Sequence, residues 1–127
     1  MNAEFDWSHY LDLACELAKC RSDDALVEAK QRCAVSRAYY SVLIRARNYL
    51  RRKDGIRAPR LDTHAFVIDK YRSSDAQDRR DIADNLNELR KYRTLADYED
   101  SVPLLGRFVG LALGYAKKTA ELLGKSP

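Results

Sequence analysis

The stretch from Asp24 to Lys53, DALVEAKQRCAVSRAYYSVLIRARNYLRRK, contains neither glycine nor proline. Apolar residues recur along it at the intervals of a helical stripe, and these are Leu26, Cys33, Tyr40 and Ile44. A periodic run of this length predicts one long helix that packs against others. The rest of the fold is expected to assemble around this helix.

Four further helices are expected outside this stretch. They cover Trp7–Lys19, Thr63–Tyr71, Ala76–Leu95 and Val102–Leu123, and the Thr63–Tyr71 helix is short. The expected helix-start residues are Asp6, Ser22 or Asp23, Asp62 or Thr63, Ser74 or Asp75, and Ser101 with Pro103 in the first turn. No segment alternates at period two, and short connections favour antiparallel neighbours. The sequence therefore predicts an all-α, up-and-down bundle of four long helices plus one short helix.

Length and composition are typical of a globular protein. The chain has 127 residues, 46% hydrophobic and 33% charged, which fits a single domain covering residues 1–127. No apolar run approaches the roughly 18 residues of a membrane span, and the first residues lack signal-peptide features. Three cysteines, without paired spacing for zinc, are expected to be reduced and buried. We therefore expect a cytoplasmic protein with no membrane association.

Positive charge is concentrated in one stretch. The net charge is +4, yet the segment from Arg45 to Arg60 holds seven basic residues against the single acid Asp54. The basic residues are Arg45, Arg47, Arg51, Arg52, Lys53, Arg57 and Arg60. A patch of this kind suits a polyanion such as RNA. The alternative is a solvated helix end that complements the helix dipole.

Two arginines interrupt predicted apolar stripes. Arg37 falls within the stripe of the Asp24–Lys53 helix, and Arg93 continues the stripe formed by Ile82, Leu86 and Leu89. A buried guanidinium must be paired, and Asp97 lies one helical turn after Arg93. We therefore predict a cluster of these two arginines with Asp97, near Tyr40 and Tyr98. It is either a structural ion pair or an anion-binding or catalytic site.

Glycines and histidines leave alternatives open. Gly106, Gly110 and Gly114 are spaced by four within a predicted helix, which indicates either tight packing inside the chain or a dimer contact. His9 is expected to be exposed. His64 is either an exposed residue at a helix start or a proton-transfer group near RNA. Their separation predicts no metal site, and no cofactor-binding motif is present.

Three segments resemble the HEPN superfamily of small helical domains found in prokaryotic toxin–antitoxin and RNA-defence systems. They are Ser36-Arg37-Ala38-Tyr39-Tyr40, Thr63-His64 and Leu89-Arg90-Lys91-Tyr92-Arg93-Thr94-Leu95-Ala96-Asp97-Tyr98. With the helix order, the resemblance covers the chain from about Trp7 to Leu123. The last segment is the most specific, because it is similar to the Ala-Asp-Tyr ending of the fourth helix in a group of short prokaryotic members.

The resemblance implies a HEPN-like bundle that forms a homodimer. Many members cleave RNA without metal, through an arginine followed by four to six residues and a histidine, at the dimer cleft. A small nucleotidyltransferase antitoxin is often the partner, and in some pairs it adds AMP to a tyrosine near this motif. The corresponding tyrosine here is Tyr98.

This sequence departs from the catalytic pattern of the superfamily. Six residues separate Arg90 from Asp97, which stands where the resemblance implies a histidine, and no histidine follows His64. An aspartate is ionised near neutral pH and repels phosphate. Ribonuclease activity therefore stays open, with Arg90, Arg93, Asp97 and His64 as the candidate catalytic residues.

Two functions are accordingly expected. The first is RNA binding within a toxin–antitoxin or stress module, with metal-independent cleavage left open. The binding residues would be Arg37, Arg45, Arg47, Arg51, Arg52 and Lys53. The second is a non-enzymatic dimeric module that partners a nucleotidyltransferase, with the Arg37, Arg93 and Asp97 cluster bracing the fold.

Overall fold

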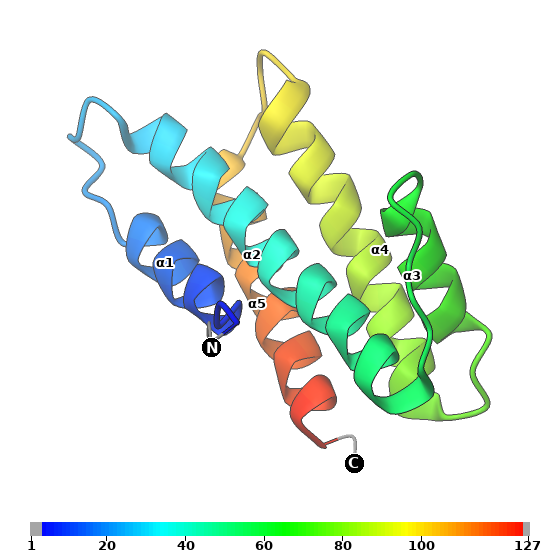
Figure 1. The fold of residues 1–127 in the computed structure, drawn as a ribbon. Helices are drawn as coiled ribbons and strands as arrows, with labels where there is room; N and C mark the ends of the chain where they lie inside the picture. The colour runs from blue at the N-terminus through cyan, green and yellow to red at the C-terminus, as the bar shows by residue number, and fades with distance from the viewer. Residues whose placement is uncertain (1–3, 126–127) are drawn as a thin grey trace.

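The computed structural model describes residues 4–125, which form an all-α bundle of five helices (Figure 1). The helices are α1 (Ser8–Ala18), α2 (Val27–Tyr49), α3 (Thr63–Arg72), α4 (Gln77–Tyr98) and α5 (Leu105–Lys125), and a short π-helical turn, η1 (Leu50–Asp54), extends α2. The predicted all-α bundle is confirmed. Within residues 4–125, every helix is too short or too polar to cross a membrane.

Helix α2 occupies the centre of the bundle. It packs against α1, α3, α4 and α5, whereas α3 lies chiefly against α4 (Figure 1). Helix α4 runs beside α2 in the opposite direction, and α5 passes behind α2 and also packs against α4. Residues on α2 therefore reach both the α1 side and the α3–α4 side of the molecule.

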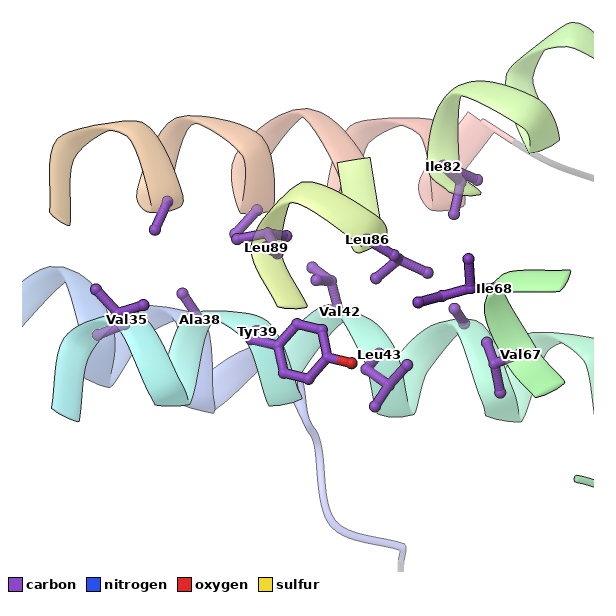
Figure 2. Packing of buried hydrophobic residues seen from close by; sticks show 14 of the residues in the cluster. Val35, Ala38, Tyr39, Val42, Leu43, Val67, Ile68, Ile82, Leu86 and Leu89 are labelled. Atoms are coloured by element: carbon purple, nitrogen blue, oxygen red, sulfur yellow. The ribbon is translucent and has the colours of Figure 1, made fainter. Parts of the chain in front are cut away.

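The core forms where α2 packs against α3, α4 and α5, and α5 contributes the buried Val109, Ala112 and Ala116. In Figure 2, Val42 of α2 faces Leu86 and Leu89 of α4, and Ile68 of α3 lies beside Leu86. The same buried cluster includes Val35, Ala38, Tyr39, Leu43, Val67 and Ile82. Within each helix these apolar residues recur about every 3.6 positions, and this spacing places them on one face of the helix. The α4 stripe predicted from sequence is confirmed, since Ile82, Leu86 and Leu89 are fully buried.

The predicted core stripe of α2 is wrong. Leu26 is 60% exposed and Cys33 is exposed, while Tyr40 and Ile44 are only partly buried. The buried face instead carries Val35, Ala38, Val42, Ala46 and Tyr49, with Tyr39, Leu43 and Leu50 beside them. The face expected to be internal therefore lies along the outside of the bundle, and Arg37 lies on it.

Several helix ends also differ from the predictions. Helix α5 begins at Leu105, not at Val102 with a Ser101 cap, because Leu104 has a left-handed backbone (φ 59°) that interrupts any earlier helical turn. Helix α2 does not continue unchanged to Lys53. At its end the N–H groups of Gly55 and Ile56 both donate to the carbonyl of Leu50, which widens the last turn into η1.

The glycine and cysteine predictions are corrected as well. A Cβ built on Gly110 or Gly114 would meet nothing within 4 Å, and on Gly106 only the Gln31 amide at 3.8 Å. These glycines therefore do not permit tight packing within the chain. Cys15 and Cys20 are partly buried and Cys33 is exposed, so none of the three is a core residue.

Candidate anion-binding site

Among residues 4–124, Arg93 is the only buried cationic side chain, with 9% of the residue exposed. Its position on α4 directs the guanidinium between aromatic rings, 5.5 Å from the ring centre of Tyr39, 5.7 Å from Tyr40 and 5.8 Å from Tyr98. Asp97, one turn later, lies 3.7 Å away. The buried Nε of Arg93 has no hydrogen-bond partner. The cation is thus only partly compensated.

The end of α4 that carries Asp97 is held by Arg32 of α2. The guanidinium of Arg32 donates to the carbonyl oxygens of Ala96 (3.0 Å), Glu99 (2.6 Å) and Asp100 (3.2 Å). The last carbonyls of a helix lack partners within the helix, and a cationic donor satisfies them. Arg32 therefore fixes the register between α2 and α4 at the level of Asp97.

Ser36 connects Arg37 to Asp97. Its hydroxyl accepts a hydrogen bond from Arg37 Nη2 at 3.3 Å and donates one to Asp97 Oδ2 at 3.4 Å. The Arg37 guanidinium also faces the rings of Tyr10 (5.0 Å) and Tyr40 (5.5 Å). The structure thus brings together Arg37, Arg93 and Asp97, with Tyr40 and Tyr98 beside them, as the sequence predicted.

His64 joins the same site from α3. Its Nδ1 lies 2.7 Å from the Tyr39 hydroxyl, and its ring contacts Tyr40 edge-on at 5.8 Å. Burial raises the pKa of the Tyr39 hydroxyl, which therefore stays protonated. A buried hydroxyl hydrogen requires an acceptor, so we assign Tyr39 as the donor and Nδ1 as the acceptor. His64 then presents Nε2–H as a donor.

Burial and positive neighbours also determine the charge of His64. Burial lowers its pKa below the usual value of 6.5, and Arg93 and Arg90 lower it further. His64 is therefore neutral at pH 7. It is partly buried rather than exposed, so the exposed alternative is wrong, whereas His9 is exposed as predicted.

The basic residues after Arg37 divide between two sides of α2. Arg47, Arg51 and Arg57 line a hollow of about 310 Å³ together with Asn48. Arg45 and Arg52 line another, which also contains the acids Glu4 and Asp6. Lys53 is exposed. The hollow lined by Arg47, Arg51 and Arg57 is the more basic of the two. In it, Arg47 donates a hydrogen bond to Oδ1 of Asn48 at 3.0 Å, and Asn48 carries no charge.

The acid of this segment does not neutralise the basic hollow. Asp54 accepts two hydrogen bonds from Arg79 of α4, one of them at 3.0 Å, and Arg79 holds the pKa of Asp54 below its usual value. Arg51 has a single weak ion pair, 3.5 Å from Glu4. The hollow lined by Arg47, Arg51 and Arg57 therefore keeps an excess of positive charge.

Sequence reasoning missed three residues of the site. Tyr39 and Ser36 belong to the segment that carries the family resemblance, but their roles depend on residues 25 and 61 positions away. No sequence signal identifies Arg32 as the residue that donates to the carbonyl oxygens at the C-terminal end of α4. Among residues 4–125, no group of His, Cys, Asp and Glu could hold a metal ion.

Chemically, the arrangement can bind an anion through Arg93, Arg37 and His64 Nε2–H. Arg90 adds positive charge, and the tyrosine rings restrict access by water. Comparison with family models, curated proteins and solved structures finds no match.

Proposed function

We propose that this chain binds RNA, as a cytoplasmic HEPN-type component of a toxin–antitoxin or RNA-related stress module. The phosphate backbone would contact Arg93, Arg90 and Arg37 and continue toward Arg47 and Arg51. The resemblance supports the family, and the charge distribution supports the ligand. A homodimer would place two such sites together.

One observation carries this proposal, the incompletely compensated guanidinium of Arg93. Burying an arginine raises the free energy of the folded state by about several kcal/mol unless hydrogen bonds and an opposite charge compensate its lost hydration. Arg93 has one carboxylate at 3.7 Å and an Nε without a partner. A phosphate group beside the guanidinium would supply the opposite charge that one carboxylate at 3.7 Å provides only in part, which is why the site suits an anionic ligand better than a purely structural role.

The geometry supports binding more than cleavage. A general base needs a free lone pair near the attacking hydroxyl. His64 Nδ1 is occupied by the Tyr39 hydroxyl, and Nε2 carries the proton in the tautomer assigned above. Asp97 is engaged by Arg93 and Ser36. His64 would therefore donate a hydrogen bond to phosphate or ribose, and we propose no cleavage step.

Salt-dependent RNA binding tests this proposal. Fluorescence anisotropy with single-stranded RNA should show affinity that falls with salt, and Arg93→Met should weaken binding at least about tenfold and reduce the salt slope by about 0.7. Arg107→Met removes the same charge from an exposed position on α5 and should have little effect. Equal binding by the wild type and Arg93→Met would contradict the proposal.

The same preparation decides whether RNA is cut. Wild-type protein incubated with total RNA and tRNA without metal should leave both intact. Cleavage that disappears in Arg93→Met and His64→Gln would establish an enzyme in place of a binding protein.

A second candidate is an interaction module whose partner is a nucleotidyltransferase. It is favoured by Tyr98, which is 71% exposed at the end of α4. An exposed phenol hydroxyl is accessible to a modifying enzyme. Co-expression with such an enzyme and mass spectrometry of Tyr98 against a Tyr98→Phe control tests this candidate.

A further inference from the structure

The outward face of α2 contributes to an apolar groove. Leu26, Ala29 and Cys33 of this face line it together with Leu13 and Leu17 of α1 and Ala96 of α4, around a volume of about 570 Å³. Leu26 is 60% exposed and Leu13 42% exposed. Leucines open to solvent in one concave surface are typical of a binding site for another molecule.

Three cations border the groove, and two of them are already compensated. Lys30 forms an ion pair with Asp24, and Arg32 donates to the carbonyls at the end of α4. Arg37 differs, because its contacts are Ser36 Oγ and two tyrosine rings. Within residues 4–125 no carboxylate forms an ion pair with it. Asp97 also lines the groove, but it forms an ion pair with Arg93 and accepts a hydrogen bond from Ser36. The groove therefore has an apolar length and, at its end, one cation that no carboxylate pairs with directly.

We infer that this groove binds an amphipathic helix of a partner protein, with leucines one turn apart on the Leu13 and Leu26 side and a carboxylate that meets Arg37. A groove between two helices accommodates the apolar face of a third helix. The side chains of that third helix that enter the groove are four positions apart in its sequence. The charge complementarity at Arg37 selects an acidic helix over a neutral or basic one. This inference goes beyond RNA binding and shares only Arg37 with it.

The exposed thiol of Cys33 provides a direct readout. A synthetic helical peptide with leucines four positions apart and a glutamate one turn further should protect Cys33 from maleimide, measured by mass spectrometry of the peptide containing Cys33. The matched peptide carries glutamine in place of the glutamate. Cys15 and Cys20, which are partly buried, report any general change in reactivity.

A double-mutant cycle tests the charge pair. Arg37→Gln should weaken binding of the glutamate peptide about tenfold and leave the glutamine peptide nearly unchanged. Leu26→Ser should abolish protection by both peptides. Since Leu26 is exposed, this variant should keep the wild-type circular dichroism, and it should keep wild-type RNA affinity because it removes no charge.

Three results would overturn the inference. The first is no protection of Cys33 at millimolar peptide, and the second is equal protection by the two peptides. The third is a change of solution mass from dimer to monomer in Leu26→Ser, which would make the groove an interface between copies of the chain. Loss of RNA binding in Arg93→Met with intact peptide binding would separate this inference from the proposed function.

Discussion

The hydroxyl of Tyr39 lies 2.7 Å from Nδ1 of His64, and this hydrogen bond joins the central helix to α3 beside a buried arginine. Tyr39→Phe should leave Nδ1 without its donor and lower the free energy of unfolding by about 1–2 kcal/mol. Long-range ¹⁵N–¹H NMR should show the Nε2–H tautomer in the wild type and a mixture in the variant. Tyr40→Phe, whose ring contacts His64 without this bond, should keep the tautomer.

The lowered pKa of His64 predicts how stability depends on pH. Between its folded and unfolded pKa the unfolded chain binds more protons, so the free energy of unfolding rises with pH in that range. The wild type should therefore lose stability as pH falls below about 6.5, the value of an unperturbed histidine. Urea titrations from pH 5 to 8 measure this slope. A His64→Gln variant with an unchanged slope would contradict the assignment.

Asp97 should affect stability and RNA affinity in opposite directions. Asp97→Asn removes the carboxylate nearest Arg93, which should lower the free energy of unfolding by about 1 kcal/mol. It also removes a negative charge from the binding site and should raise RNA affinity about threefold. Denaturation and anisotropy on the same sample check both. Weaker RNA binding would show that Asp97 is needed to orient the arginines.

The bidentate pair of Arg79 and Asp54 should be a major stabilising contact between η1 and α4. Both side chains are less than one-third exposed, and the Arg79 guanidinium also faces the rings of Tyr49 and Tyr71. Arg79→Ala should lower the free energy of unfolding by about 2 kcal/mol. Arg72→Ala, which removes a surface ion pair with Asp69, should change it by less than about 0.5 kcal/mol.

Open space around two glycines predicts stabilisation. Because a Cβ at Gly110 or Gly114 meets nothing, alanine at each should raise the free energy of unfolding by up to about 1 kcal/mol. Thermal denaturation of the double variant measures the gain. A loss of dimer mass with this variant would instead support the dimer contact.

Helix positions could largely be predicted from sequence, because glycine and proline are scarce and the apolar spacing is regular. The stripe of α4 was predicted correctly, and it placed Arg93 inward. The outward face of α2 was mistaken for its core face because apolar residues line both, and only the positions of α1, α4 and α5 decide which face is covered. For α5, the left-handed Leu104 overrode the start signal of Ser101 and Pro103.

The candidate site was predicted only in part. Arg93 and Asp97 are one turn apart, so their contact follows from helical geometry. The bond between Tyr39 and His64 joins two helices, and no local pattern indicates it. Arg45 and Arg52 seemed part of one patch with Arg47, but neighbouring residues on a helix point in different directions, which separates them.

Arg37 lies at the border between the groove and the anion-binding site, and a carboxylate bound to its guanidinium would offset part of the positive charge that attracts phosphate. Binding of a partner helix in the groove would therefore weaken RNA binding at the anion-binding site, without any movement of the backbone. Competition for one cation would give a partner protein a means of releasing nucleic acid.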